Sequence, residues 1–346
     1  MLDLPLRAVD QSNTVSLIVA VADYAATYAV ETASAIATAR QCLIDALTHG
    51  FEALRDPECA ALINPLVPGA LMPGGARVPG TSLELDPAQA AFCTGLMLCR
   101  TADGSPWEAL HSGCAADPIG AILAVADYQG RKAAMEGKPP LKVRDVLGSI
   151  VKALEVQRVL ADETANRHTG VGAMTIRFAR VAATAMVTAQ LGGSLVQIAN
   201  ALSCAVIDGD VLPPGQLPYD MQREDWARAD SVSRAVRYAC RATAAHRASY
   251  LTSLDLGAVD AAGKLLGAKP STPRKTFGTD VILRLADMRK PQHAAQLATR
   301  FQTAVERYFP PRQADRIKAL FAAPDRLDDL PINELLAAVV TNGSSR

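Results

Sequence analysis

The sequence predicts an all-α protein, a helical bundle formed by a single domain over residues 1–346. Three observations support this class. Apolar residues recur at spacings of three and four through most of the chain, as they do in helices with one buried face. Small residues are frequent in these segments, so the helices can approach one another closely. Only residues 281–286 alternate as a strand would, and they have no partner strand in the sequence.

The composition excludes several classes of protein. With 346 residues, 49% of them apolar and 20% charged, the chain can bury a sizeable core. Basic and acidic residues number 35 each and form no basic run, so we expect neither nucleic acid nor a membrane as a partner. The N-terminus shows no secretory signal, and its apolar residues 16–22 are too few to cross a bilayer, which predicts a cytoplasmic protein.

The cysteines do not indicate a special site. There are seven, an odd number, and no two of them form a CxxC pair. Most lie in apolar helical segments, where a thiol behaves as a small buried side chain. We therefore expect no disulfide framework, no metal site and no cofactor.

The helices follow in chain order from periodicity and capping. An Asp-Pro start at Asp86 and Pro87 opens one helix, and Ser194 with Gln197 forms a capping box that opens another. Five prolines between residues 56 and 87 exclude a long helix there and predict an ordered loop. Residues 129–140 are charged and predicted to form turns, and residues 208–225 are predicted to form a loop. The predicted helices are residues 31–54, 87–98, 119–128, 143–161, 175–190, 194–207, 231–245, 300–309, 313–322 and 332–340.

The polar loop from Arg100 to Pro118 is the first candidate for a functional site. It lies between two apolar helices and carries several side chains that can transfer a proton or bind a ligand. A loop held by buried helices is where a helical protein can place chemistry. The loop side chains of interest are Asp103, Ser105, Trp107, Glu108, His111, Cys114 and Asp117.

Together with the segment before it, this loop resembles a known family. The stretches ETASAIATARQCLIDALTHGFEALRDPECAALINPLVPGALMPGGARVPGTSLELDPAQAAF, VRDVLGSIVKALEVQ, DWARADSVSRAVR and RYFPPRQADRIKALFAAPDRLDDLPINELLAAVV are similar to the 2-methylcitrate dehydratase branch of the MmgE/PrpD family. The resemblance implies the helical domain of that family, association as a homodimer, and removal of a proton next to a carboxylate with loss of water or carbon dioxide from a small polyacid. The α/β lid of the family is largely deleted here, with residues 250–295 as a truncated remnant.

The chain departs from the family where that chemistry lies. The family reads approximately D-F-N/D-D-T-W, then H-P. Aligned on Trp107, this chain has Ala102, Ser105 and Pro106 at the first Asp, the last Asp and the Thr, and Cys114 at the His. In a second family motif, K-x-W-A-A-G, the lysine two residues before the tryptophan resembles a carboxylate anchor, and this chain has Glu224 at that position.

The candidate site residues follow from what remains. We predict catalytic roles for Asp103, His111, Cys114 and His168, because these loop side chains can exchange a proton near neutral pH. For the cysteine and both histidines an incidental role stays open, as a filler residue or a loop residue without function. Asp117 is expected to cap the following helix. Arg228 and Arg223 either bind an anion or are solvated, and the predicted substrate-binding residues are Trp107, Asp208, Arg223 and Glu224.

Two functions are compatible with this pattern. The first is a diverged lyase-like enzyme, which acts on a carboxylate- or carbonyl-containing small molecule by proton abstraction and elimination or cyclisation, and which is not a 2-methylcitrate dehydratase. The alternative is a non-catalytic pseudoenzyme that binds a ligand or an active paralogue.

Overall fold

The structure is a computed structural model that describes residues 17–100, 115–164, 171–208, 221–244 and 291–341. Its elements in chain order are α1 (Leu17–Thr27), α2 (Ala33–Ala53), α3 (Pro57–Leu62), β1 (Ala76–Arg77), β2 (Glu84–Leu85), α4 (Pro87–Cys99), α5 (Ile119–Met135), α6 (Val143–Thr164), α7 (Val171–Gln190), α8 (Leu195–Ile207), α9 (Met221–Ala244), α13 (Pro291–Tyr308), α14 (Pro311–Phe321), α15 (Pro324–Asp329) and α16 (Ile332–Ala338). The predicted all-α class is confirmed. In the described part of the chain every helix is too short or too polar to traverse a bilayer.

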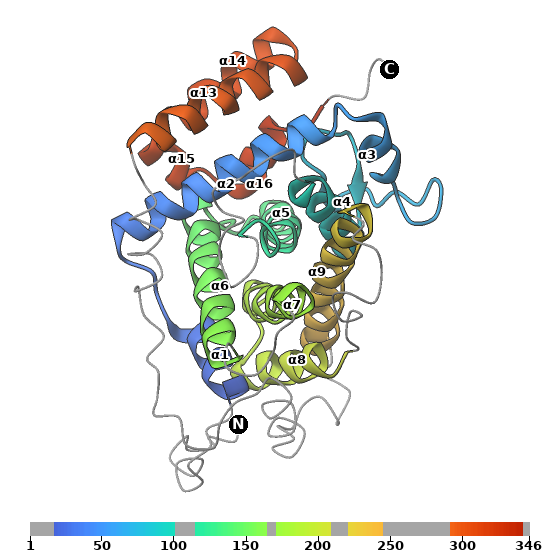
Figure 1. The fold of residues 1–346 in the computed structure, drawn as a ribbon, viewed down its shortest axis with the longest axis vertical. Helices are drawn as coiled ribbons and strands as arrows, with labels where there is room; N and C mark the ends of the chain where they lie inside the picture. The colour runs from blue at the N-terminus through green and yellow to red at the C-terminus, as the bar shows by residue number, and fades with distance from the viewer. Residues whose placement is uncertain (1–16, 101–114, 165–170, 209–220, 245–290, 342–346) are drawn as a thin grey trace, which may run out of the picture.

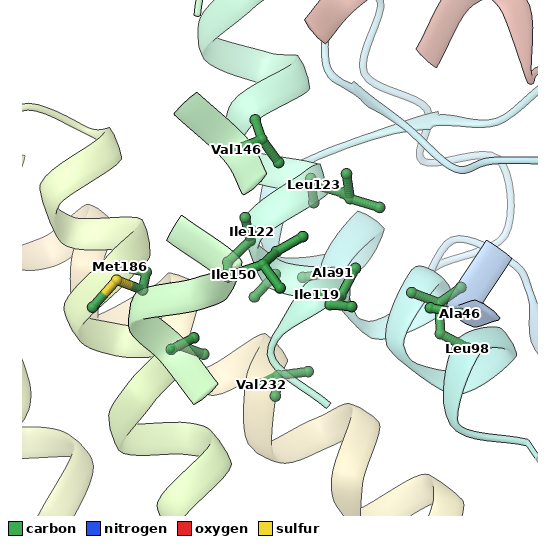
Figure 2. Close-up of a cluster of buried hydrophobic side chains, with 14 of the residues drawn as sticks. Ala46, Ala91, Leu98, Ile119, Ile122, Leu123, Val146, Ile150, Met186 and Val232 are labelled. Atoms are coloured by element: carbon green, nitrogen blue, oxygen red, sulfur yellow. The ribbon is translucent and has the colours of Figure 1, made fainter. Parts of the chain in front are cut away.

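Helices α5 and α7 lie in the middle of the bundle, and α1, α2, α4, α6, α8 and α9 surround them (Figure 1). Every residue of α5 from Ile119 to Asp127 is buried. A helix enclosed on all sides must be apolar on all sides, which explains the unbroken run of apolar and small residues here. Figure 2 shows the core where side chains of α4, α5, α6, α7 and α9 meet, including those of Ala91, Ile122, Ile150, Met186 and Val232.

Two glycines allow α4 and α5 to cross at backbone contact. A Cβ atom at Gly120 of α5 would lie 2.7 Å from the backbone nitrogen of Gly95 in α4, closer than real side chains come. On the other side, a Cβ at Gly95 would lie 3.2 Å from Cγ2 of Val232 in α9. Gly95 is therefore packed between α5 and α9. This contact brings the end of α4 to the start of α5 and to the first half of α9.

The segment predicted as an ordered loop, residues 56–87, contains short regular elements that the sequence did not indicate. Asp56 caps α3, and its side chain accepts a hydrogen bond from the Glu58 N–H at 3.0 Å. Strands β1 and β2 pair antiparallel, with Ala76 opposite Leu85. The prolines and glycines keep these elements short, but they do not prevent them.

The C-terminal helices pack onto the bundle from outside. Helix α13 lies along α2 (Figure 1), α14 packs against α13, and α16 packs against α5. Two ion pairs fasten these helices to α2: Arg40 to Asp328 at 2.6 Å, and Arg300 to Glu52 at 2.6 Å. The predicted helices 313–322 and 332–340 are confirmed as α14 and α16, within two residues at each end.

Both predicted helix starts are confirmed in atomic detail. The Asp86 side chain accepts hydrogen bonds from the backbone N–H groups of Ala88 and Gln89. Ser194 and Gln197 form the complete capping box. Polar residues of these types satisfy N–H groups that a helix leaves unpaired at its start.

Several helix boundaries were predicted wrongly. Helix α5 runs on to Met135 through the segment expected to be turn-like, α9 begins at Met221 rather than 231, and α13 begins at Pro291 rather than 300. Helices α1 and α15 were not predicted. The missed parts of α5 and α9 are rich in charged residues, and such turns lack the apolar stripe that reveals a helical period. The predicted strand 281–286 lies outside the described residues, as does the predicted lid remnant up to residue 290.

Candidate functional site

All four predicted catalytic residues lie outside the described residues. Segment 101–114 joins α4 to α5, and segment 165–170 joins α6 to α7. Arg223 is in α9, but its side chain is also outside the described part. The predicted residues in these two segments are Asp103, Trp107, His111, Cys114 and His168.

The structure does describe the frame from which the 101–114 segment starts and to which it returns. We call this frame the α4–α5–α9 junction. It comprises the last residues of α4, the residues before α5 and the first turns of α9, which the Gly95–Gly120 contact draws together. Its charged and thiol groups come from three elements distant in sequence. They are Cys99, Arg100, Asp117, Glu224, Asp225 and Arg228.

Asp117 is the most deeply buried carboxylate of the junction, with 1% of its surface exposed. The Cys99 thiol donates a hydrogen bond to its Oδ1 at 3.2 Å, and Nη1 of Arg228 lies 3.9 Å from the same oxygen. The expectation that Asp117 caps α5 is wrong. The N-cap of α5 is Pro118, and no side chain caps the helix there. Asp117 instead connects the ends of α4, α5 and α9.

Glu224 and Arg228 form an ion pair along one face of α9. Their side chains lie one helical turn apart, with Nη2 of Arg228 2.7 Å from Oε1 of Glu224. Glu224 stands where the resemblance places a lysine that anchors a substrate carboxylate. Because Arg228 follows four residues later, the junction keeps a cation near that place, although the cation now comes from the next helical turn and is paired within the protein.

Arg100 is the second cation of the junction. Its guanidinium lies 2.5 Å from Oδ2 of Asp56 and 3.7 Å from Oε2 of Glu58, so it ties the end of α4 to the start of α3. The thiol of Cys59 lies nearby, and burial raises its pKa to about 11. A thiol with so high a pKa stays protonated at neutral pH and is a poor nucleophile.

Asp225 is the group with the most unusual electrostatics in the junction. Its side chain is buried, and this desolvation raises its pKa from the ordinary 3.8 to about 7, although the positive charges of Arg228 and Arg100 act in the opposite direction. The negative charges of Glu224 and Asp117 add to the increase. A carboxyl group that changes its charge near neutral pH can both donate and accept a proton under working conditions.

Asp208, a predicted substrate-binding residue, lies at the end of α8 in a separate cluster. Its carboxylate is 2.7 Å from Nη1 of Arg234 and 3.5 Å from Nη1 of Arg180. Arg180 is almost fully buried and also donates hydrogen bonds to the carbonyl oxygens of Ala205 and Asp208. Asp208 thus joins α8 to α7 and α9, and its role toward a substrate stays a prediction.

Cysteine burial agrees with the expectation for four of the six described thiols. Cys42, Cys59, Cys93 and Cys99 are buried, whereas Cys240 is partly exposed and Cys204 is exposed. Among the described residues, no three histidine, cysteine or acidic side chains are grouped as metal ligands.

Sequence reasoning missed Cys99, Arg100 and Asp225 as members of the site. The signal for Asp225 was weak but present, because it immediately precedes Trp226 of the second motif. The burial of Asp225 could not be predicted, because residues 208–225 were predicted as a loop, whereas Asp225 lies in α9. Cys99 was treated as the end of a helix, and Arg100 was named only as the first residue of the candidate loop, without a role of its own.

Comparison with known proteins gives the family. Residues 19–250 match the MmgE/PrpD N-terminal domain. The chain is 38% identical to 2-methylcitrate dehydratase of Cupriavidus necator over 84% of its own length and 59% of that protein. It is 42% identical to 2-methylcitrate dehydratase of Salmonella typhimurium over 65% of this chain and 46% of that protein. With mitochondrial 2-methylcitrate dehydratase of Yarrowia lipolytica it shares 40% identity, over 66% of this chain and 44% of that protein.

These matches span most of the bundle. The first covers 293 residues, more than the N-terminal domain match, and that domain match includes the α4–α5–α9 junction. The chain itself spans about half the length of the curated relatives it matches. On this evidence the chain belongs to the MmgE/PrpD family.

Proposed function

We propose that the protein is a diverged MmgE/PrpD-family lyase-like enzyme. It acts on a small molecule that contains a carboxylate or carbonyl group, by proton abstraction followed by elimination or cyclisation. A base removes a proton from the carbon next to that group, the electron pair of the broken C–H bond forms a new bond, and the leaving group departs with its own electron pair. The observation that carries the proposal is Asp225, a buried carboxyl whose pKa is raised to about 7 by burial and which lies close enough to Arg228 and Arg100 for their charges to act on it.

The position of the junction also supports an enzyme. The segment that carries Asp103, His111 and Cys114 leaves from and returns to this junction. Both of its attachment points therefore belong to the part of the protein that contains Arg100 and Arg228. Arginine is suited to bind a carboxylate through two parallel hydrogen bonds. A proton-transfer group next to cations that hold a carboxylate is the arrangement that proton abstraction requires.

We further propose that 2-methylcitrate is not the substrate. Ala102, Ser105, Pro106 and Cys114 stand where the resemblance places proton-handling and hydroxyl groups. Loss of a general acid or base typically lowers a rate by about 10² to 10⁴, and several such groups are replaced together. Under this proposal the protein performs related chemistry with a different set of residues.

Proton abstraction can be measured without knowing the product. The purified chain is incubated in D₂O with a panel of di- and tricarboxylates, and the substrate C–H signals are followed by ¹H NMR. Exchange or elimination with at least one member of the panel is expected, together with no meaningful conversion of 2-methylcitrate or cis-aconitate. Robust turnover of either acid would contradict the divergence, and no exchange with any member would contradict the enzyme.

Variants at the predicted residues then locate the chemistry. His111→Ala or His168→Ala should lower turnover strongly while the melting temperature stays nearly unchanged, because the sequence predicts that both residues lie in loops outside the core. If both variants and Cys114→Ala retain full activity, the chemistry lies elsewhere. If all three unfold the protein, these residues are structural.

The alternative is a non-catalytic protein that binds a ligand or an active paralogue. The Glu224–Arg228 ion pair favours it, because the junction satisfies its own charge at the place of the family lysine. Binding of a carboxylate from the panel without exchange would support this alternative. The homodimer that the resemblance implies also remains a proposal, and native mass spectrometry tests its stoichiometry. The cytoplasmic location predicted from the N-terminal sequence remains a proposal as well.

A further inference from the structure

Asp225 differs from every other buried carboxylate in the described part of the chain. Six acidic side chains there are at most 9% exposed, and five of them have an ion-pair partner within 4.0 Å. Asp225 makes no hydrogen bond and no ion pair with a described residue, although only 9% of its surface is exposed. The five paired side chains are Asp45, Asp117, Asp127, Glu155 and Asp328.

The helix packing places Asp225 at the end of α4. Ser233 of α9 donates a hydrogen bond to the carbonyl of Ala88 near the start of α4, and Ala229, one turn earlier, packs on Gly95. The two helices therefore run in opposite directions along this contact. Asp225, one further turn back, comes beside Arg100, where α4 ends and segment 101–114 begins.

Charged and titratable groups face Asp225 from each neighbouring element. Glu224 and Arg228 come from α9, Arg100 from the end of α4, Asp117 from the start of α5, and Cys59 from α3. Neither arginine is committed to Asp225, since the closest carboxylates are Asp56 for Arg100 and Glu224 for Arg228. The Asp225 carboxyl thus has cations in its vicinity but no partner of its own.

Most of Asp225 is buried, so its anion is poorly solvated, although its oxygens are not among the fully buried polar atoms that lack a hydrogen-bond partner and thus retain access to solvent. In its acid form the carboxyl has no acceptor among the described residues. A ligand carboxylate would supply that acceptor. A protonated carboxyl can donate an O–H hydrogen bond to a carboxylate oxygen, and such charge-assisted bonds are short and strong. The negative charge of the ligand would in turn favour the protonated form of Asp225, because two negative charges at close range repel each other.

We propose that Asp225 binds the ligand in its carboxylic-acid form, donating a hydrogen bond to a ligand carboxylate at the α4–α5–α9 junction, so that binding takes up a proton. The proposal rests on the proposed function for the location of the ligand. To that function it adds the group that binds the ligand, Asp225, the neutral form in which Asp225 binds, and the uptake of a proton on binding. The bond that forms is O–H to carboxylate oxygen, and the proton comes from solvent when the carboxyl is ionised.

Isothermal titration calorimetry measures the proton directly. The probes are fumarate and tricarballylate, whose own carboxyl groups are largely ionised at pH 7. Titrations at pH 7 in buffers with different ionisation enthalpies give the number of protons taken up from the dependence of the observed enthalpy on the buffer. About half a proton is expected at pH 7, because a group titrating near that pH is about half protonated before binding.

The affinity should depend on pH in the same way. If only the protonated form binds, Kd rises about tenfold between pH 6 and pH 8, in proportion to the shrinking protonated fraction. Asp225→Asn, which cannot titrate, should remove the proton uptake and flatten this dependence. Asp225→Glu should retain both, and Asp230→Asn, a change on the same helix outside the junction, should behave as the unmodified protein.

The outcomes separate the two proposals. Proton uptake that persists in Asp225→Asn, or binding without uptake in the unmodified protein, would overturn this inference while leaving the lyase proposal standing. Asp225-dependent uptake without any turnover would contradict the lyase proposal and support this inference. Absence of binding by both probes would overturn the inference, because it requires a carboxylate at the junction. Circular dichroism confirms that each variant is folded.

Discussion

The two ends of α5 bury carboxylates in opposite ways. Near its C-terminal end, Asp127 is fully buried and receives three hydrogen bonds from Arg77, two from the guanidinium and one from the backbone N–H. The Arg77 guanidinium also donates a hydrogen bond to the carbonyl oxygen of Asn333 in the first turn of α16. At the N-terminal end, the contacts of Asp117 include the Cys99 thiol and an arginine nitrogen at 3.9 Å, and the neighbouring Asp225 makes no hydrogen bond or ion pair with a described residue.

The difference separates structural from functional burial. A buried charge contributes to a defined fold only when its hydrogen bonds are satisfied. Asp127 meets that condition and fastens the β1–β2 ribbon and α16 to the central helix. Asp225 does not meet it with any described residue, and a buried carboxyl with a raised pKa is a candidate for binding or catalysis. The predictions below test this contrast, from the largest expected effect to the smallest.

Removal of Arg77 should have the largest effect on stability. Arg77→Ala leaves the Asp127 charge buried without a partner, which is expected to lower the free energy of unfolding by about 3–5 kcal/mol. Urea denaturation measures the change. Arg131→Ala is the matched control, because Arg131 pairs with Glu84 at 2.8 Å on the same ribbon but Glu84 is one-third exposed, so its loss should cost less. Equal losses in the two variants would contradict the structural role of Asp127.

Asp225 should affect stability in the opposite direction. Its folded-state pKa, about 7, lies above its ordinary 3.8, so between these values the folded protein binds more protons than the unfolded chain. The contribution of this group is therefore present at low pH and is lost as the pH rises through 7. Asp225→Asn, which stays neutral, should be more stable than the unmodified protein at pH 8, by on the order of 2–4 kcal/mol, and similar to it near pH 4.

Urea denaturation at pH 4, 6 and 8 measures this pH dependence. Asp127→Asn serves as the comparison, because it removes a well-bonded carboxylate and should destabilise the protein at pH 8. A difference between Asp225→Asn and the unmodified protein that does not change with pH would show that Asp225 has an ordinary pKa.

The next largest effect on stability is expected from a substitution at the Gly95–Gly120 contact, which positions the junction. Gly120→Ala places a methyl group 2.7 Å from the Gly95 nitrogen, so α4 and α5 must separate, at an expected cost of about 1–3 kcal/mol. The same change should displace Asp117 from Cys99 and reduce carboxylate binding. Gly148→Ala is the control, since a methyl group there meets only Val30, at 3.9 Å, and should stabilise α6 by about 0.5–1 kcal/mol. If both substitutions stabilise the protein, the close crossing is not as described.

The smallest effect is expected at Glu224. Its ion pair with Arg228 is partly exposed, so Glu224→Gln should change the free energy of unfolding by less than about 1 kcal/mol. The substitution frees Arg228 for a ligand, and the affinity for fumarate should increase. Thermal unfolding and calorimetry measure the two quantities. Weaker fumarate binding in this variant would show that Arg228 does not face the ligand.

The fold could be predicted from the sequence to the extent that burial determines it. Helices with an apolar stripe or a capping residue, such as those opened by Asp86 and Ser194, were identified with nearly correct starts. The charged part of α5 after Tyr128 and the first turns of α9 were missed, because their polar surfaces carry no period. Helix α1 was missed although it is buried, since its apolar run was considered only as a membrane segment.

The candidate site was only partly predictable. The sequence predicts a functional loop after Arg100 because polar groups gather between two apolar helices, and that prediction falls on residues outside the described part of the chain. The role of Asp117 was assigned wrongly. An aspartate that caps a helix and a buried aspartate that binds side chains of other helices occur in the same sequence pattern before a helix. Their difference depends on Cys99 and Arg228, which approach through the Gly95–Gly120 contact. The special character of Asp225 likewise depends on burial by distant elements, which one sequence does not reveal.

The titration of the Asp225 carboxyl itself tests the contrast most directly. A protein labelled with ¹³C at aspartate carboxyl carbons can be followed by NMR between pH 3 and pH 9, with the Asp225 signal assigned from its absence in Asp225→Asn. The account predicts a midpoint near pH 7 for Asp225. A midpoint near the ordinary 3.8 would mean that the carboxyl is ionised and satisfied at neutral pH, and would contradict the distinction between the two ends of α5.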